Sequence, residues 1–285
     1  MEFDRLVSVL KEASLPKRIE MLEIIRDSGE NGIEHSKLNE LVKNGLGLPP
    51  STFYRSLNNM FSLGLIRKDD DKIYLTPIGT LLIDAIQCIN DLLEFEYLDI
   101  ASAFVLTIPP EMRFGVRYIK ECKKVDITET SRLVYDLIAG VEKGGKYIDR
   151  IIDPDLYALM LKKRKECATE KVISSVDTVI PRLNAEIEAA KKTNFDRDTI
   201  EELEEKLEIK VLDLPLQLGV IDERIGVIMF LKDKYFTPIF ITEDKKAVRW
   251  MDSVFDYYWD MAEPLDKYLE GGMEGWKRRV VEAVS

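Results

Sequence analysis

The sequence predicts a multidomain chain: an N-terminal winged helix-turn-helix domain of the α+β class, a helical connector, and a C-terminal α/β domain with a mixed sheet. Three helical patterns followed by a hairpin pattern in residues 16–75 predict the first part. Alternating strand and helix patterns after residue 129 predict the last part. We place the three parts at residues 1–85, 86–128 and 129–285.

The N-terminal domain opens with an expected helix that begins at Pro16 and stops at Asp27-Ser28-Gly29. Ile33 then stands alone in a short link, and residues 38–42 carry the apolar stripe of a second, short helix. A third helix is expected from about Pro50 to Leu63, because proline suits the first helical turn and the following glycine suits the left-handed conformation after a helix.

Two short strands are predicted next, at residues 65–68 and 72–75, around a tight turn of three aspartates. A long apolar helix should follow from Pro77 and continue to about Phe104. Its apolar surface exceeds the need of one small domain, so we expect a dimerisation or interdomain helix, with Leu81 to Phe95 as the candidate interface. An ordinary buried helix is the alternative.

The C-terminal part alternates strands and helices, which predicts a partly parallel sheet with antiparallel strands at one edge. Residues 271–275 are expected to form a flexible joint, and residues 276–281 a short basic helix that packs on the domain. The expected helices are residues 130–141, 156–165, 181–192, 198–206 and 243–263, and the expected strands are residues 147–152, 171–176, 210–214, 216–221, 226–231 and 236–241.

Composition excludes several kinds of chemistry. The chain has one histidine, His35, and three cysteines that lie at least 34 positions apart, which excludes clustered zinc sites and histidine-based catalysis away from His35. We therefore expect no cofactor and no metal. The cysteine pattern suits a reducing cytosol, and no signal segment or membrane-length apolar run is present, so we expect a cytoplasmic protein without membrane contact.

The charge is unevenly distributed along the chain. The 285 residues include 41 Lys and Arg against 52 Asp and Glu, a formal net charge of −11, which argues against a protein coated in nucleic acid or lying on an anionic membrane. Residues 1–85 hold 11 basic and 13 acidic side chains, so most of the acidity lies in residues 86–285. A local basic patch remains compatible with this balance.

The third helix of the N-terminal domain carries the candidate nucleic-acid contact. On a 100° wheel its apolar residues face one side, whereas Arg55, Asn58 and neighbouring hydroxyl residues occupy the other. Arginine pairs with guanine and asparagine with adenine, so we predict double-stranded DNA as a partner, the alternative being a solvated polar face. The predicted DNA-binding residues are Ser36, Ser51, Thr52, Tyr54, Arg55, Asn58, Asn59, Arg67, Lys68 and Lys72.

The hairpin is the weaker part of this surface. Arg67, Lys68 and Lys72 can grip phosphates, but the three aspartates at the tip repel them, so we expect the strands rather than the tip to meet the DNA backbone. His35 is expected to cap a helix or contact phosphate, with an ordinary surface residue as the alternative. A dimer is expected, because two recognition helices on a symmetric site supply contacts that one cannot.

Two stretches resemble known families. IEHSKLNELVKNGLGLPPSTFYRSLNNMFSLGLIRKDDDKIYLTPIGTLLI, within residues 17–83, resembles the winged-helix domain of prokaryotic, especially archaeal, transcription regulators. YIDRIIDPDL, KVISSV, GVIDERIGVIMFL and ITEDKKAVRWMDSVFDYYWDMAEPL, within residues 129–265, are similar to the regulatory domain of the methanogenesis regulatory protein type and to the effector domain of the archaeal TrmB type. The resemblance implies a domain that senses a ligand or assembles dimers.

Enzymatic alternatives find little support. Such sensing domains are distantly similar to phospholipase D half-domains, but residues 129–285 contain no histidine for that reaction. A methyltransferase is disfavoured because the double glycine at 144–145 precedes a strand and no GxGxxG opens a helix. Asp153, Ser174 and Asp213 fall near the ends of predicted parallel strands, where α/β sheets bind ligands, although each also suits a turn or a helix cap.

The sequence thus predicts a homodimeric, sequence-specific transcription regulator whose C-terminal domain senses an unidentified small molecule or mediates assembly. The alternative is an interaction module whose winged helix binds a partner protein, favoured by the acidic hairpin tip and the net charge of −11. An enzyme ranks third and is the least favoured possibility, because nothing in the sequence assembles a nucleophile, a base and an oxyanion site.

Overall fold

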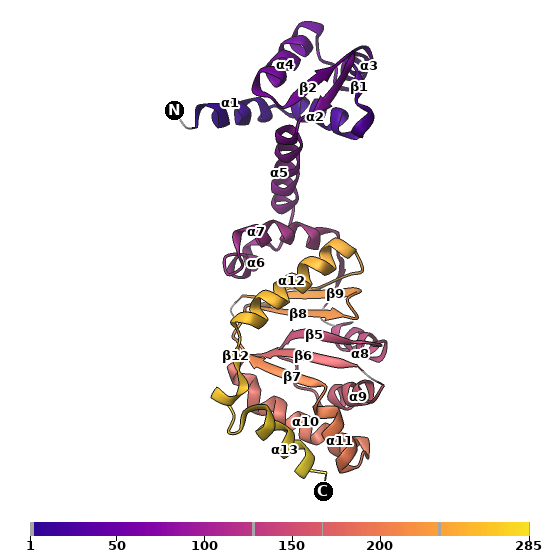
Figure 1. The fold of residues 1–285 in the computed structure, drawn as a ribbon, viewed down its shortest axis with the longest axis vertical. Coiled ribbons are helices and arrows are strands. Elements are labelled where there is room, and N and C mark those ends of the chain that lie inside the picture. The colour runs from indigo at the N-terminus through magenta and orange to yellow at the C-terminus, as the bar shows by residue number, and fades with distance from the viewer. Residues whose placement is uncertain (1–2, 127–128, 167, 233–234, 285) are drawn as a thin grey trace. The chain divides into compact units, whose positions relative to one another are not determined.

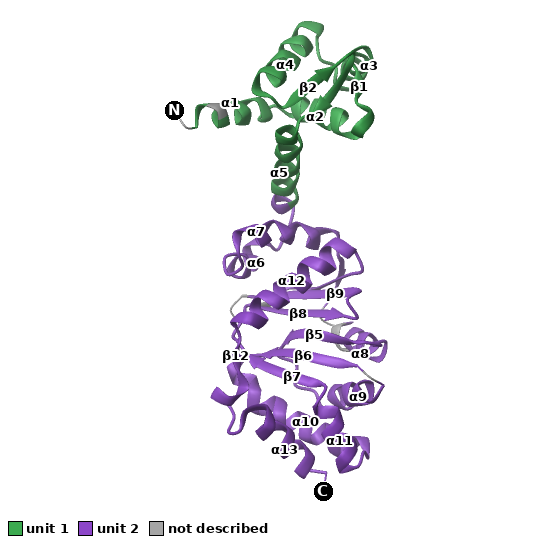
Figure 2. Ribbon diagram, in the orientation of Figure 1, with its two compact units in different colours: residues 1–91 green, residues 92–285 purple. Residues whose placement is uncertain are grey.

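The computed structural model describes residues 3–126, 129–166, 168–232 and 235–284. The chain forms two compact units, Met1–Asp91 and Leu92–Ser285 (Figure 2). Each unit has a hydrophobic core of its own and is treated separately. The domain boundaries drawn from the sequence at residues 85 and 128 stay predictions.

Unit 1 consists of helices around a small antiparallel sheet with strand order β1-β3-β2 (Figure 1). The three helices and the hairpin expected in residues 16–75 are present, with ends close to those predicted. Its elements are α1 (Asp4–Ala13), α2 (Pro16–Asp27), η1 (Gly29–Asn31), β1 (Ile33–Glu34), α3 (His35–Leu41), η2 (Val42–Leu46), α4 (Pro50–Leu63), β2 (Ile66–Asp69), β3 (Lys72–Leu75) and α5 (Pro77–Leu93), whose last two residues belong to unit 2.

Helix α4 begins and ends where the sequence indicates. Pro50 occupies its first turn, and Gly64 follows it with a left-handed backbone, φ 74°. Phe53, Leu57 and Met60 are buried against α2 and the sheet, as the helical wheel predicts. The opposite face of α4 is therefore left to solvent.

Two predictions in unit 1 are wrong. Ile33 lies in a strand rather than an unstructured link, because it pairs with Ile73 of β3, a partner 40 residues away that no local pattern reveals. The long helix from Pro77 ends at Leu93 instead of continuing to Phe104. Phe95 packs in the core of unit 2 against the rings of Phe230 and Phe240, at centroid distances of 6.4 and 5.7 Å, so burial outweighs helix continuation there.

Unit 2 is built on a mixed sheet of order β12-β7-β6-β5-β8-β9-β11-β4, with β10 paired to β9. Strands β5, β6 and β7 run parallel, whereas β5 to β8 and the pairs beyond it are antiparallel, so the predicted mixed sheet is confirmed. The strands are β4 (Lys123–Val125), β5 (Gly144–Asp149), β6 (Thr169–Ser174), β7 (Leu207–Val211), β8 (Leu216–Ile221), β9 (Ile225–Lys232), β10 (Tyr235–Phe236), β11 (Ile239–Thr242) and β12 (Glu263–Pro264).

Helices cover both faces of this sheet. Alternation along β5 sends Tyr147 to one face and Ile148 to the other. Helices α8 to α11 and α13 pack on the first face, and α12 with α6 packs on the second (Figure 1). The helices are α6 (Leu98–Val105), α7 (Pro110–Arg113), η3 (Phe114–Glu121), α8 (Thr130–Ala139), α9 (Pro154–Lys165), η5 (Val176–Thr178), α10 (Val179–Thr193), α11 (Arg197–Glu204), α12 (Lys245–Met261), η6 (Leu265–Lys267) and α13 (Gly272–Glu282).

Glycine accounts for two further corrections. Strand β5 begins at Gly144 rather than at residue 147, because a Cβ at Gly144 would lie 2.0 Å from the carbonyl oxygen of Thr169, so glycine permits the close approach of β6. The glycines of residues 271–275 form the start of α13 instead of a flexible joint. A Cβ at Gly275 would lie 2.1 Å from the carbonyl oxygen of Glu270. The packing role predicted for residues 276–281 is confirmed by Trp276, which is completely buried.

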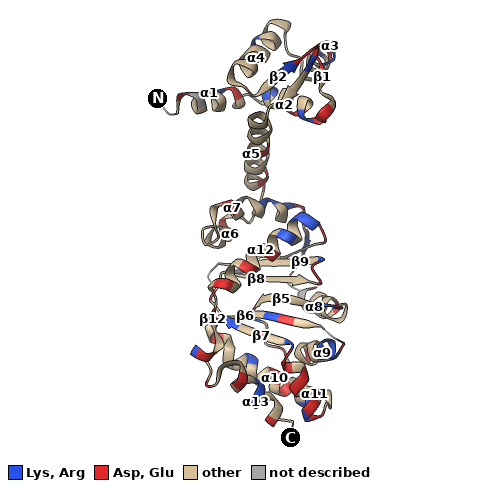
Figure 3. Ribbon diagram, in the orientation of Figure 1, with Lys and Arg blue, Asp and Glu red and all other residues tan. Residues whose placement is uncertain are grey.

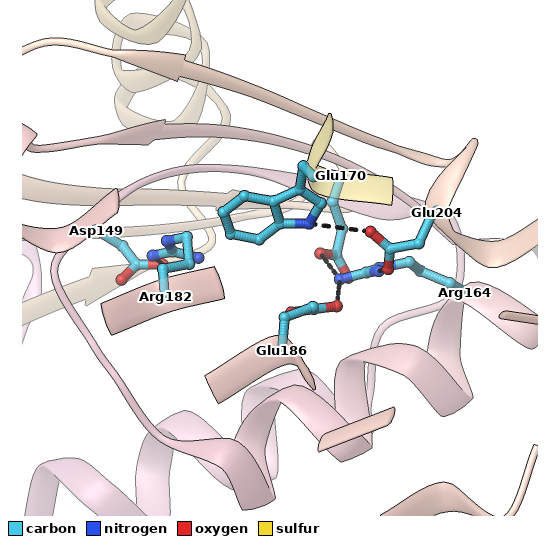
Figure 4. Close-up of polar contacts among 7 residues, drawn as sticks. Asp149, Arg164, Glu170, Arg182, Glu186 and Glu204 are labelled. Carbon is cyan, nitrogen blue, oxygen red and sulfur yellow. Dashed lines mark hydrogen bonds and ion pairs between the residues drawn. The ribbon is translucent and has the colours of Figure 1, made fainter. Parts of the chain in front are cut away.

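A buried ion network ties the helices of the first face together (Figure 4). Arg164 of α9 lies 2.8 Å from Glu204, 2.7 Å from Glu186 and 3.2 Å from Glu170, each measured from a guanidinium nitrogen to a carboxylate oxygen. Trp276 of α13 donates to the second oxygen of Glu204 at 3.1 Å. Burial raises the pKa of Glu204 to about 8 and also raises the pKa of Glu170. Three carboxylates thus surround the single guanidinium group of Arg164.

Candidate nucleic-acid interface

The polar face of α4 is exposed as the sequence predicts. Ser51, Tyr54, Arg55 and Asn58 are exposed, and Thr52 is half-buried. Arg55 is the single charged residue in α4 (Figure 3). Within residues 3–126, the side chains of Arg55 and Asn58 have no hydrogen-bond or ion-pair partner. Both are therefore free to bind an external group.

Asn59 occupies a different environment from Asn58. Its side-chain amide donates to Glu12 of α1 at 3.3 Å, and Arg18 of α2 donates to the same carboxylate oxygen. Glu12 is only 6% exposed, so its carboxylate has lost most of its hydrogen bonds to water. The two donors compensate for that loss. Asn59 thus links α1 to α4, a role for which the sequence carries no local signal.

The start of α3 lies beside α4 through aromatic contacts. The His35 ring stacks on Tyr54 with a centroid distance of 5.7 Å and an interplanar angle of 23°, and it meets Phe53 edge-on at 5.8 Å. Ser36 is exposed in the first turn of α3. These contacts fix the Tyr54 ring at the border of the polar face, so His35 has a positioning role that the sequence analysis did not identify.

The cations of the β2–β3 hairpin all have partners within unit 1. Arg67 lies over the Tyr74 ring at 4.6 Å and 3.5 Å from Asp69, and Lys68 lies 3.9 Å from Asp71. Lys72 donates to the carbonyl oxygen of Asn31 at 3.0 Å. Exposed ion pairs of this kind contribute little to stability, so phosphate can replace these carboxylates.

The three ligand residues predicted in unit 2 have structural roles. Asp153 caps α9 by accepting from the backbone N–H groups of residues 155 and 156. It also accepts from the Tyr135 hydroxyl at 2.9 Å; burial and this carboxylate raise the pKa of Tyr135 to about 12. Ser174 is fully buried and lies 2.8 Å from the Thr178 hydroxyl, and Asp213 accepts from the backbone N–H of residue 176 at 3.1 Å. Their ligand-binding role stays a prediction.

Two negative observations apply to the described residues. None of the helices there is long and apolar enough to cross a membrane. No group of three or more His, Cys, Asp or Glu side chains in this part of the chain lies in a position to hold a metal ion.

Fold and surface define the chain as a small helical unit with an exposed polar helix, followed by an α/β unit with a mixed sheet. Residues 176–261 match the family model of the middle domain of the methanogenesis regulatory protein FilR1. The resemblance stated for the stretches within residues 129–265 is thereby confirmed over residues 176–261. No curated protein matches the chain significantly.

Several solved structures are similar in outline. TrmBL2, an archaeal chromatin protein described as showing a novel mode of DNA binding, is 17% identical, with 91% of this chain and 98% of that chain covered and a TM-score of 0.37. Nuc of Salmonella typhimurium, a phospholipase D family member, is 11% identical, with 47% and 88% covered and a TM-score of 0.35. The S-adenosylmethionine-dependent methyltransferase SibL is 14% identical, with 74% and 63% covered and a TM-score of 0.26.

Proposed function

We propose that unit 1 is a winged helix-turn-helix domain that binds double-stranded DNA sequence-specifically, and that the chain is a transcription regulator. The observation that carries this proposal is the exposed face of α4, on which Arg55 and Asn58 have no partner among the described residues. With α4 in the major groove, Arg55 donates two hydrogen bonds to a guanine and Asn58 pairs with an adenine. Ser51 and Tyr54 then reach the phosphates beside them.

The proposed regulator acts as a dimer through α5. Ile78, Leu81, Ala85 and Ile89 lie within about 80° of one another around this helix. Ile78, Leu81 and Ile89 are 48%, 63% and 52% exposed, which is unusual for such large apolar side chains on one helix face. A second copy that packs its own α5 on this face buries all four residues and presents two α4 helices to a symmetric operator.

Unit 2 is proposed to set the activity of this dimer, either by sensing a ligand or by mediating assembly. Support comes from the match of residues 176–261 to a regulatory protein family. The sheet also changes from parallel to antiparallel pairing at β5, and such changes are where α/β sheets commonly bind ligands.

The proposal is tested by selecting bound sequences from random duplexes with the full chain at moderate salt. Enrichment of a symmetric motif is expected. Arg55→Ala should then weaken binding to that motif by about 1–3 kcal/mol and relax the preference at one base of each half-site. Arg132→Ala is the matched control, because Arg132 of unit 2 is also exposed, with 91% of its side-chain surface accessible.

Two results would contradict the proposal. An absence of enrichment over competitor DNA would remove the DNA-binding function and favour the alternative, in which unit 1 binds a partner protein. An unchanged base preference in Arg55→Ala would remove the base-reading role of Arg55, since a phosphate contact alone lowers affinity equally for all sequences.

A further inference from the structure

Unit 2 has a partly open cavity of about 90 Å³ on the first face of its sheet. Its floor is formed by β5, β8, β9 and β11, and side chains of α8 and of the first turns of α9 form its walls. By the same measure a single water needs about 10–15 Å³, so the cavity has room for about six to nine waters or as many non-hydrogen atoms of a ligand.

The lining is almost entirely hydrocarbon. Val134, Leu137 and Ile138 of α8 face Val227 and Met229 of β9 across the cavity. An apolar space of this size is poorly hydrated, because waters inside it find few hydrogen-bond partners. Filling it with apolar atoms restores the van der Waals contacts that the walls lack.

Besides the Tyr147 hydroxyl, the cavity has two polar side chains, and these differ in their availability. Asp149 is already neutralised: it lies 2.8 Å from a guanidinium nitrogen of Arg182 and accepts from the backbone N–H of Ile151 at 2.6 Å. Gln217 of β8 also lines the cavity, and its side-chain amide has no hydrogen-bond partner in the described part of the chain. A ligand therefore meets the Gln217 amide and, among the described residues, no unpaired charge.

Gly219 in β8 leaves the space open. It stands opposite Tyr147 in the β5–β8 register. A Cβ at Gly219 would lie 3.6 Å from the nearest atom of Tyr147 and 3.8 Å from Val227, which is ordinary van der Waals contact. Neither a clash nor a positive φ requires glycine here, and glycine weakens a strand interior. The missing side chain is what keeps the cavity unfilled.

The cavity also lies where the sheet changes direction. Strand β5 is parallel to β6 on one side and antiparallel to β8 on the other, and both β5 and β8 contribute to the floor. Changes in strand order or direction are where open α/β sheets most often bind small molecules. Asp153, Ser174 and Asp213 do not line this space.

We propose that this cavity binds a small neutral molecule of about six to nine non-hydrogen atoms, mainly hydrocarbon, with one polar group that hydrogen-bonds to Gln217. The occupant makes its apolar contacts with α8 on one side and with the strands on the other. Its effect on DNA binding rests on the proposed function of unit 1, whereas its binding to unit 2 does not.

The test is calorimetric titration of the full chain with indole, which has nine non-hydrogen atoms and one N–H donor. Indene, which has the same size and no donor, and benzoate, which is charged, serve as matched probes. We expect saturable binding of one indole per chain, weaker binding of indene, and none of benzoate. Gln217→Leu should remove the preference for indole over indene, since leucine offers no hydrogen bond.

Gly219→Val fills the cavity and should weaken indole binding about tenfold or more while leaving the melting temperature equal or higher. Gly219→Ala, a smaller change, gives a partial loss and is the variant to use if valine impairs folding. Absence of saturable binding by indole and indene up to their solubility, or equal binding by Gly219→Ala, Gly219→Val and the parent chain, overturns the proposal.

DNA binding is then measured separately, as the operator affinity of the full chain with and without indole. Saturable indole binding together with absent DNA binding rejects only the proposed function. DNA binding together with absent indole binding rejects only the cavity ligand.

Discussion

Asn58 and Asn59 are adjacent residues with separate tasks. Asn58 is exposed and has no partner among the described residues, whereas Asn59 donates to the buried carboxylate of Glu12. The difference comes from packing, because α1 lies against one flank of α4, and Glu12 of α1 accepts a hydrogen bond from the side chain on that flank. The same residue type at consecutive positions therefore has a proposed recognition role in one case and a structural role in the other.

This contrast predicts opposite effects of two alanine substitutions. Asn58→Ala should lower affinity for the selected operator and leave unfolding unchanged. Asn59→Ala should lower the free energy of unfolding of unit 1 by about 1 kcal/mol, because Glu12 loses one of its donors. Chemical denaturation and operator titration of both variants measure the two effects, and equal effects on stability would contradict the assigned roles.

The buried ion network of unit 2 makes stability depend on pH. Burial raises the pKa of Glu204 to about 8, from an ordinary value of 4.5 in the unfolded chain. Between these values the folded chain holds a proton that the unfolded chain releases. The contribution to stability is therefore complete at and below pH 4.5, and it is lost as pH rises toward about 8.

The free energy of unfolding of the full chain should accordingly fall as pH rises from about 5 to about 8. Glu204→Gln, which mimics the protonated carboxyl, should flatten this slope and be more stable relative to the parent chain at pH 8 than at pH 5. Denaturant titrations across this range provide the measurement. Glu205→Gln is the control, since Glu205 is 65% exposed and pairs with Lys277 on the surface; parallel curves for both variants would refute the assignment.

At the scale of elements, α5 combines a packed face with an exposed apolar face. Gly79 marks the packed face: a Cβ there would lie 2.0 Å from the backbone carbonyl oxygen of Leu65. The exposed face carries Ile78, Leu81, Ala85 and Ile89, while Thr80 and Asp84 lie on the polar side. One helix thus closes the core of unit 1 and carries the face proposed to meet a second copy.

Gly79→Ala should destabilise unit 1 by about 1–3 kcal/mol. Alanine is the better helix former by about 1 kcal/mol, so a loss shows that the contact with the Leu65 carbonyl outweighs helix propensity. Gly45→Ala is the control, because a Cβ at Gly45 meets no atom within 4 Å and its φ is not positive. That variant should be neutral or slightly more stable in the same denaturation experiment.

Leu81→Glu should dissociate the proposed dimer, because it places a charge on the apolar face of α5. Sedimentation velocity is expected to show a monomer, and operator binding should weaken while the helix content stays unchanged. Thr80→Glu, on the polar side of the same helix, should remain dimeric. An unchanged sedimentation profile for Leu81→Glu would place the interface elsewhere.

At the scale of the whole molecule, the charge is divided between the parts. Residues 1–85 carry 11 basic and 13 acidic side chains, so the remaining residues carry 30 and 39. If a nearly neutral domain joined to an acidic one binds DNA as proposed, its binding depends on a few local cations rather than on a general positive field. Specific base contacts then matter more for affinity than they do in strongly basic proteins.

The salt dependence of operator binding tests this view. Arg55, Arg67, Lys68 and Lys72 give eight cations in the proposed dimer, so log K against log salt should have a slope no steeper than about −7. Lys68→Ala should reduce the slope by about 2 and lower affinity for all sequences alike. A steeper slope in filter-binding titrations would mean that basic residues outside this set contact the DNA.

The sequence by itself determined the features that depend on neighbouring residues. Pro50 and Gly64 bound α4, and the helical period of Phe53, Leu57 and Met60 sets its buried face and hence its polar face. The alternation of strands and helices likewise predicted the mixed sheet of unit 2. Local backbone preference and hydrophobic periodicity carry this information.

Only the tertiary structure decided what depends on partners distant in the chain. Ile33 lies in a strand because it pairs with Ile73. Phe95 lies beyond the end of α5 and packs against the ring of Phe240. Asn59 donates a hydrogen bond to Glu12. The cavity at Gly219 exists because β5, β8, β9 and α8 meet around a position without a side chain. Such contacts depend on the packing of whole elements, which no local pattern encodes.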